Sequence, residues 1–253
     1  MNHWLEPHIH ALLIGHRGAS AHAPENTLAS FRLAREQGAD AIELDAKRCA
    51  TGEVVVMHDV ELRRTTGASG KVHAWSLSDL RGLDAGQGER VPTLDEVFED
   101  AGPTLLINVE VTNYSTPDDG LEAAVVDIVR RHGIAGRIVF SSFNPLSLRQ
   151  LAAIAPDIPR AFVYNAKTPF DLQQVFGDPL MPHEFRHPHH SLVNADDVSV
   201  WRARGIGVNA WTVNDPAEIR RMAACGVNGI FGDSPLTMRE VLQTHSEGGE
   251  DRI

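Results

Sequence analysis

Two histidines and one arginine stand where apolar runs end, the position at which a strand delivers side chains to a site. His16 and Arg17 follow the run "ALLIG", and His58 closes the run "EVVVMH". Histidine changes charge near neutral pH, so two of them can transfer protons on both sides of a reacting phosphoryl group. A guanidinium matches phosphate oxygens with its planar fork. Taken one at a time, each histidine could be a packing residue, and the arginine could form an ion pair with an inward carboxylate. Together they favour acid–base chemistry on a phosphate ester.

Three carboxylates are predicted to share an inward face. In "AIELDAKR", residues 41–48, alternation places Glu43, Asp45 and Lys47 opposite the apolar side chains, and "TLLINVEVTN" places Glu110 in the same way. Each acid alone could be a solvated position or half of an ion pair. Three inward acids, however, require a cation nearby. Their hard oxygen ligands predict one divalent cation, Mg²⁺ or Ca²⁺, rather than structural zinc.

The elements that must position these residues alternate along nearly the whole chain. The nine candidate strands are "ALLIG", "AIELDA", "EVVVMHD", "TLLINVEV", "RIVFSSF", "RAFVYN", "SLVNA", "GVNAWTV" and "GIFGD". Segments with helical spacing separate most of them, the clearest being "DGLEAAVVDIVRRHG". A parallel sheet covered by helices follows, and 253 residues suit a closed (β/α)₈ TIM-like barrel as a single domain over residues 1–253.

One pair of candidate strands is too closely spaced for a helical crossover. Only Thr51 and Gly52 separate "AIELDAKRCA" from "EVVVMHD", which predicts an antiparallel hairpin. If Ala50 pairs with Glu53, His58 lies opposite Asp45. Residues 60–102 then break the rhythm with Gly-rich, charged stretches. They are interpreted as a short insertion after the third strand that shapes the substrate face.

Composition limits the partners. The formal net charge is −11, so long-range fields repel nucleic acids and anionic lipid surfaces, and any anionic substrate must be captured locally. The residues described above favour a small phosphodiester as that partner. The two cysteines are too few for a disulfide framework and are expected to be reduced. No leader peptide and no integral membrane segment is recognised, which makes the cytoplasm the default compartment. Oligomeric state stays open.

The quoted motifs resemble the glycerophosphodiester phosphodiesterase family. The matching segments run in order along almost the full chain: "HRGASAHAPENT", "GADAIELDAKRCATGEVVVMHD", "LRRTTG", "VPTLDEVF", "INVEV", "SSFNPLSL", "VNAWTVNDPAEI" and "GVNGIFGDSP". The resemblance implies a barrel that uses a divalent ion to hydrolyse glycerophosphodiesters to glycerol 3-phosphate and an alcohol. It also implies roles for the residues found above: metal ligands for Glu43, Asp45 and Glu110, acid and base for His16 and His58, and a phosphate contact for Arg17.

The sequence departs from the family pattern at one charged position. The family follows the third acid with a lysine two positions on, whereas here Thr112 stands there. Lys47 is the proposed substitute, since it shares the inward face, although a surface lysine is an equal interpretation. Trp211, in "AWTVN", is predicted to form an apolar wall for the substrate. The histidine-rich segment "HEFRHPHH", 183–190, could bind a transition metal, but a surface loop without specific function is favoured.

Three functional hypotheses follow. Metal-dependent hydrolysis of a glycerophosphodiester is favoured. A lysophospholipase D-like activity on lysophospholipid headgroups is the first alternative. A non-catalytic barrel that binds a phosphorylated metabolite is the second. The residues leave open which histidine is the acid, and whether the nucleophile is water or a neighbouring substrate hydroxyl that forms a cyclic phosphate.

Overall fold

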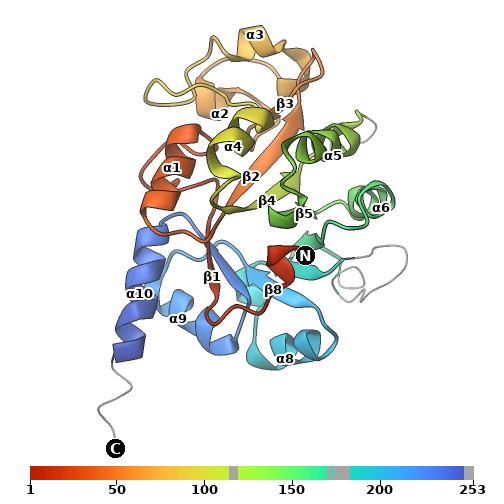
Figure 1. Ribbon diagram of the computed structural model, residues 1–253. Coiled ribbons are helices and arrows are strands. Elements are labelled where there is room, and N and C mark those ends of the chain that lie inside the picture. Colours follow the sequence, from red (N-terminus) through yellow and green to blue (C-terminus); the bar gives the residue numbers. More distant parts are fainter. Residues whose placement is uncertain (114–118, 170–172, 174–182, 248–253) are drawn as a thin grey trace, which may run out of the picture.

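Eight parallel strands close into a barrel in the computed structural model, which describes residues 1–113, 119–169, 173 and 183–247 (Figure 1). Strand β1 pairs with both β2 and β9, which closes the ring and confirms the predicted (β/α)₈ barrel. A ninth strand, β3 (Val54–Val56), lies outside the ring, antiparallel to β2. The barrel strands are β1 (Leu12–Gly15), β2 (Ala41–Arg48), β4 (Leu106–Val111), β5 (Ile138–Ser142), β6 (Arg160–Tyr164), β7 (Phe185–Pro188), β8 (Gly207–Ala210) and β9 (Gly229–Gly232).

Helices surround the strands, and several of them begin at side-chain caps. Thr27 and Thr93 form capping boxes at α1 and α4, and Asp215 accepts from two backbone N–H groups at the start of α9. The longer helices are α1 (Leu28–Glu36), α4 (Leu94–Ala101), α5 (Leu121–His132), α6 (Pro145–Ile154), α8 (Ala195–Ala203), α9 (Pro216–Cys225) and α10 (Pro235–Glu247). Within the described ranges, no helix combines the length and apolarity that crossing a bilayer requires.

Side-chain alternation divides the strands as predicted. Outward residues such as Ile42 and Leu44 of β2 pack with Phe31 and Val125 of the covering helices. Inward apolar residues fill the lower barrel, where Trp4 of the 3₁₀ turn η1 (His3–Leu5) closes the end. Above this layer the inward residues become polar. Both cysteines are free, as expected.

The prediction of the seventh strand is wrong. "SLVNA" forms the end of the 3₁₀ turn η4 (His190–Leu192) and the cap of α8, while β7 lies in the histidine-rich segment. Apolar patterning misses β7 because two of its buried residues are polar. His187 points into the barrel beside Phe231, and Arg186 lies under Trp201, 3.4 Å from the ring centroid.

The predicted hairpin register is wrong by one residue. Lys47 pairs with Val55, and the Met57 backbone N–H donates to the Asp45 carbonyl at 2.9 Å. Met57, rather than His58, therefore lies opposite Asp45. The prediction assumed a two-residue turn, but a longer loop forms around Gly52, whose φ of 102° suits only glycine.

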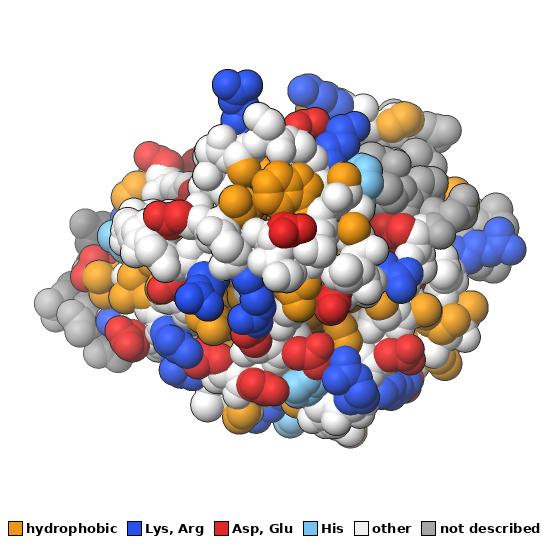
Figure 2. All heavy atoms as spheres, turned by 90° about the horizontal axis from the view of Figure 1, so that it is seen from above, with side chains coloured by type: hydrophobic (Ala, Val, Ile, Leu, Met, Phe, Trp, Pro, Cys, Tyr) orange, Lys and Arg blue, Asp and Glu red, His pale blue; other side chains and the backbone are white. Residues whose placement is uncertain are grey.

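The segment between β3 and α4 forms a lobe outside the helical ring, at the top of Figure 1. It contains α2 (Arg63–Thr66), η2 (Val72–Ala74) and α3 (Leu77–Leu80), and it has its own apolar cluster around Leu62, Val72 and Leu80. Helix α4, in the last part of residues 60–102, packs with α1 and α5 as a barrel helix. Figure 2, which looks down on the lobe, shows acidic and basic side chains interspersed around an apolar cluster. A fourth 3₁₀ turn, η3 (Ala135–Arg137), precedes β5.

Candidate active site

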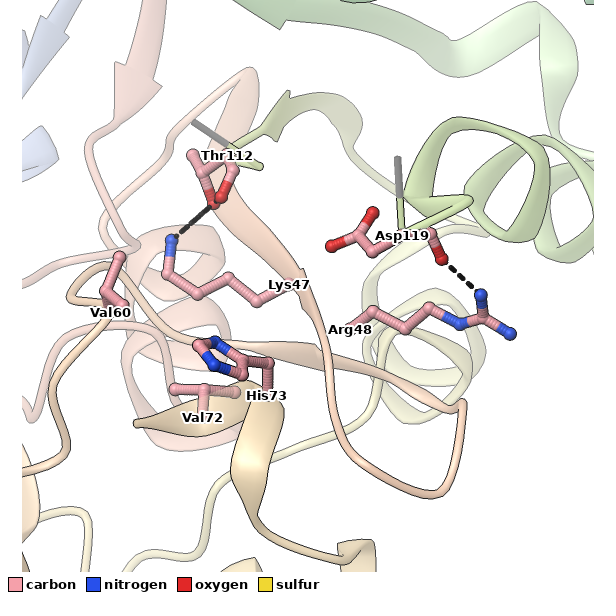
Figure 3. A pocket seen from close by; sticks show the side chains of 7 residues that line it. All are labelled: Lys47, Arg48, Val60, Val72, His73, Thr112 and Asp119. Atoms are coloured by element: carbon pink, nitrogen blue, oxygen red, sulfur yellow. Dashed lines mark hydrogen bonds between the residues drawn. The ribbon is translucent and has the colours of Figure 1, made fainter. Parts of the chain in front are cut away.

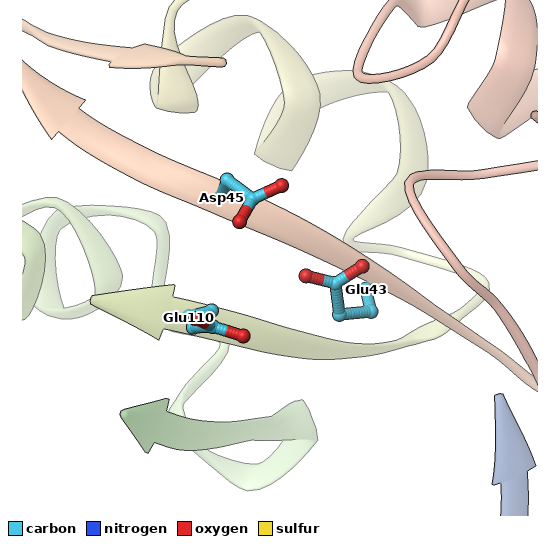
Figure 4. Close-up of side chains that lie close together, drawn as sticks. All are labelled: Glu43, Asp45 and Glu110. Carbon is cyan, nitrogen blue, oxygen red and sulfur yellow. The ribbon is translucent and has the colours of Figure 1, made fainter. Parts of the chain in front are cut away.

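The three predicted carboxylates converge inside the barrel. Asp45 of β2 and Glu110 of β4 are register partners, and Glu43 lies two residues before Asp45 on the same face. One oxygen from each acid lies within 4.8 Å of the others, and the three carboxylates point toward one another in Figure 4. Glu43 and Asp45 are buried. The structure therefore gathers from two strands the acids that the sequence placed on one face.

The electrostatics of this cluster suit a divalent cation. Burial raises the pKa of Glu43 well above its ordinary value, and the neighbouring charges of Asp45 and Glu110 raise it further. Three carboxylates held this close repel one another unless a positive charge lies among them. Their oxygens are the donors that Mg²⁺ and Ca²⁺ prefer.

Arg17 connects the acids to the loop after β1. Its backbone N–H donates to Glu43 Oε2 at 2.9 Å, and its guanidinium Nε lies 3.5 Å from Asp45 Oδ2. Nη1 donates to Glu25 Oε1 at 2.9 Å. Burial alone would lower the pKa of Arg17, but Asp45, Glu43 and Glu25 raise it above its ordinary value. Arg17 thus stays charged beside the acids.

Asn26, in the "PENT" segment, holds Asp45 in place. Its Nδ2 donates to Asp45 Oδ2 at 2.8 Å, and its side chain is buried. Both Asn26 and Arg17 adopt left-handed backbone conformations, with φ of 57° and 55°. Such conformations are uncommon for residues other than glycine and accumulate at functional sites. Thr27, in the same segment, caps helix α1.

Each histidine is paired with a carboxylate through Nδ1. His16 Nδ1 lies 2.7 Å from Asp233 Oδ1, and His58 Nδ1 lies 2.7 Å from Asp59 Oδ1. Arg64 of α2 donates to Asp59 at 2.5 Å. Burial would raise the pKa of Asp59, but the hydrogen bonds from Arg64 and His58 lower it to about 2. With Nδ1 occupied, each imidazole has Nε2 available for a substrate.

Sequence reasoning missed Asp233, which comes from the end of the last strand. Asn214 Nδ2 donates to its Oδ2 at 2.6 Å, and Ser20 Oγ donates to its Oδ1 at 3.1 Å. One feature of the sequence could have identified Asp233: it directly follows the apolar run "GIFG", as His16 and Arg17 directly follow "ALLIG". Nothing local in the sequence linked it to His16, 217 residues away.

One cavity of about 170 Å³ brings most of these groups together. Seven of the eight predicted site residues line it: His16, Arg17, Glu43, Asp45, His58, Glu110 and Trp211. The Trp211 ring meets Phe143 edge to face at 5.5 Å, and its Nε1 donates to the His187 carbonyl at 2.7 Å. Six further lining residues were not predicted: Asn108, Ser141, Phe143, Val163, His187 and Phe231.

Lys47 is the predicted residue that lies outside this cavity. Its Nζ donates to Thr112 Oγ1 at 2.5 Å in a separate small pocket that Arg48 and His73 also line (Figure 3). Lys47 is buried, so it is not a surface lysine. Burial lowers its pKa, although the charges of Asp45, Glu110 and Asp59 act in the opposite direction. Its ammonium therefore contacts the residue that stands where the family pattern has its lysine, in a pocket separate from the cavity.

The histidine-rich segment does not form a metal site within the described residues. His187 lies inside the barrel, His190 Nδ1 is 2.9 Å from Glu218 Oε2, and His189 meets Trp211 edge to face. Among the residues that the structure describes, the acidic trio is the one group of three or more such ligands close enough to share an ion. The prediction of a surface loop is wrong for residues 185–188, because they form the buried strand β7.

Several known proteins are similar to this chain over most of its length. A model described as the glycerophosphoryl diester phosphodiesterase family matches residues 16–237. A glycerophosphodiester phosphodiesterase of Caldanaerobacter subterraneus subsp. tengcongensis is 34% identical over 241 residues, 92% of this chain and 98% of that protein. A human lysophospholipase D is 27% identical, over 92% of this chain and 86% of that protein. A solved structure of an Oleispira antarctica phosphodiesterase, in complex with the product sn-glycerol-3-phosphate, has a TM-score of 0.83 at 30% identity and covers 92% of this chain and 97% of that one.

Proposed function

Because the chain belongs to the glycerophosphoryl diester phosphodiesterase family, we propose that it cleaves glycerophosphodiesters to glycerol 3-phosphate and an alcohol with the help of a divalent cation and two histidines. The chain is a phosphodiesterase, and the proposal concerns its products, cation and catalytic residues. One observation carries it: three acids, an arginine and two carboxylate-paired histidines line the same cavity. The product named for the Oleispira complex supports the choice of glycerol 3-phosphate.

The acids Glu43, Asp45 and Glu110 are the proposed holders of the cation, either Mg²⁺ or Ca²⁺. When bound there, such an ion would neutralise charge on the phosphoryl oxygens. Arg17 contributes a second, fixed positive charge at the same place, because Glu25 and Asp45 hold its guanidinium. A guanidinium that needs no rearrangement stabilises charge as it develops on the phosphoryl group.

His16 and His58 are the proposed acid–base pair. One imidazole removes the proton from the attacking hydroxyl or water, and the other donates a proton to the departing alkoxide. Asp233 and Asp59 keep each Nδ1 bonded, which fixes the ring orientation and stabilises the charged imidazolium. Both carboxylates act through a histidine and are therefore positioning residues.

The insertion, residues 60–102, is proposed to shape the substrate face. Arg64 of α2 donates to both oxygens of Glu25, at 2.7 Å each, as well as to Asp59. One side chain of the lobe thereby connects the partner of Arg17 to the partner of His58. The lobe thus supports two of the groups that the reaction uses.

Activity of the purified protein on glycerophosphocholine tests the proposal. We expect turnover that a chelator abolishes and that Mg²⁺, Ca²⁺ or Mn²⁺ restores to different extents. His16→Ala and His58→Ala should each lower kcat by about a hundredfold or more, with an unchanged unfolding transition. Activity that persists in both variants would exclude the histidine mechanism, whereas a wild type insensitive to chelator would exclude the cation.

A lysophospholipid is the second candidate substrate, favoured by the likeness to the human lysophospholipase D. Lysophosphatidylcholine belongs in the same assay as glycerophosphocholine, at concentrations below micelle formation. The polar groups of the cavity, Asn108, Ser141 and His187, favour the deacylated diester. A higher kcat/KM for the lysophospholipid would reverse that preference.

A further inference from the structure

The cavity has a polar group on the wall across from the acids. In the strand order of the barrel, β7 is four places from β2 in either direction, so the two strands lie on opposite sides. His187 of β7 lines the cavity and is 1% exposed. A phosphoryl group bound at the proposed cation site of Glu43 and Asp45 would leave room for the rest of the substrate to extend toward His187.

His187 is built to be a neutral hydrogen-bonding group. Asn209 Nδ2 donates to its Nε2 at 3.0 Å, so the neutral ring carries its proton on Nδ1. Among the described residues, the hydrogen-bond partner of the ring is Asn209, which bonds Nε2. Burial, and to a smaller extent the nearby His183, lower the pKa of His187 to about 3. The ring lines the cavity as an uncharged group whose Nδ1 is bonded by none of the described residues, and it cannot act as a third proton carrier near neutral pH.

A second open polar atom lies in the same cavity. Asn108 is 1% exposed and donates through Nδ2 to Ser141 Oγ at 2.9 Å, while its Oδ1 has no partner among the described residues. A buried acceptor without a partner is costly, and a ligand hydroxyl would satisfy it. The surrounding wall of Phe143, Val163 and Trp211 has no charge. This combination suits a small neutral polyol.

We propose that His187 is a specificity-determining residue, which hydrogen-bonds the terminal hydroxyl of the glycerol moiety and selects substrates that carry it. The proposal rests on the phosphodiesterase function proposed above and deepens it by assigning the glycerol end of the substrate to the β7 side of the cavity. A site that bonds a hydroxyl rejects the analogue without it, because the buried partner is then left unpaired. In this proposal the headgroup alcohol extends away from His187, toward the mouth of the cavity.

The test compares two diesters that differ by that one hydroxyl. Glycerophosphocholine is paired with the phosphocholine diester of propane-1,2-diol, which keeps the hydroxyl next to the ester and lacks the terminal one. We expect the wild type to prefer the glycerol diester by about tenfold or more in kcat/KM. His187→Phe and His187→Leu should reduce the preference to about twofold by slowing the glycerol diester only, and His187→Gln should recover part of it.

Two controls separate specificity from folding. His8→Phe makes the same change in a cleft at the opposite end of the barrel and should keep the wild-type preference. Because His187 stays neutral, His187→Gln should leave the shape of the pH profile of kcat/KM unchanged. At least one of His187→Phe and His187→Leu should unfold with a normal transition. If that variant still prefers the glycerol diester as the wild type does, the proposal is overturned. A wild type with no preference between the two diesters would also overturn it.

A binding arm makes failure of the two proposals distinguishable. Calorimetry measures the affinity of the wild type for glycerol 3-phosphate and for propane-1,2-diol 1-phosphate. Equal affinities, together with equal turnover of the two diesters, would overturn the role of His187 alone. The wild type could instead turn over neither diester and still bind glycerol 3-phosphate about tenfold more tightly than propane-1,2-diol 1-phosphate. If His187→Leu loses that difference in affinity, the proposed reaction is overturned and the hydroxyl site is supported.

Discussion

At the scale of single residues, the two histidines are held in unequal surroundings. Asp233 bonds His16 and is itself held by the uncharged side chains of Ser20 and Asn214. Asp59 bonds His58 but shares its charge with Arg64. An acid with neutral neighbours stabilises an imidazolium more strongly than one that is already paired with a guanidinium. We therefore expect Asp233 to be the more important of the two partners.

Asp233→Asn tests this difference. An amide can donate to Nδ1 and trap the wrong tautomer of His16, so we expect kcat to fall by about a hundredfold or more while KM changes little. The pH profile of kcat should lose one limb. Steady-state kinetics measure both effects, and Asp196→Asn, an exposed position on α8, is the matched control. Equal loss in the control, or a fall in thermal stability that matches the loss of rate, would argue for a merely structural role.

The acidic trio makes a separate prediction that needs no substrate. Saturating Mg²⁺ or Ca²⁺ should raise the thermal midpoint of the wild type by about 5 °C or more, since binding to the folded state alone stabilises it. Glu110→Gln removes one ligand and one repelling charge, so it should abolish this shift without lowering the midpoint in chelator. Glu99→Gln, exposed on α4, should keep the shift. Thermal unfolding that is indifferent to cations in the wild type would contradict the assignment.

At the scale of elements, the insertion helps to hold the β1–α1 loop, which carries Arg17 and Asn26. The loop holds Arg17 and Asn26 in left-handed conformations, and Gly18 packs so closely that an added Cβ would lie 2.4 Å from Ser30 Oγ. From the other side, Arg64 of the insertion reaches Glu25 of this loop. The active-site loop is thus held between the barrel helix α1 and the lobe, rather than by either one alone.

Arg64→Leu should weaken this support in a pH-dependent way. The pKa of Asp59 is lowered from 3.8 to about 2, so its stabilising bond with Arg64 is present above pH 3.8 and is lost as pH falls toward 2. We expect the variant to be about 1 kcal/mol less stable at pH 7, with the difference shrinking below pH 4. Chemical denaturation at several pH values measures it, with Arg63→Leu, its exposed neighbour, as control. A difference that is constant with pH would exclude the Asp59 contact as its cause.

At the scale of the whole molecule, the net charge of −11 opposes the approach of anions, while the barrel presents local positive charge at Arg17. Capture of a phosphodiester must therefore occur at short range. This predicts that the headgroup's charge controls how association responds to salt.

Raising the salt concentration from about 20 to about 300 mM should increase kcat/KM for glycerophosphoglycerol, a net anion, by about two- to fivefold, because screening weakens the repulsion. Glycerophosphocholine, which is zwitterionic, should change by less. The ratio of the two rates cancels any general effect of salt on the enzyme. A ratio that does not move would show that the net charge has no influence on substrate capture.

Local patterning was sufficient for much of this protein. Alternation along β2 and β4 identified the inward acids because a strand turns successive side chains to opposite faces whatever its neighbours are. Helical spacing likewise located α5. The same rules failed at β7, where Arg186 and His187 are buried although their types suggest a surface, and at the hairpin, where the length of the turn shifted His58 by one place.

The sequence by itself determined a set of candidate residues and the face of a strand that the three acids occupy. Only the tertiary structure decided their partners. Closure of the barrel brings Asp233 to His16, places His187 across from the acids, and turns Lys47 toward Thr112 and out of the cavity. The physical reason is that alternation is a property of one strand, whereas a contact depends on which strands are neighbours and in what register, and distant parts of the chain set both.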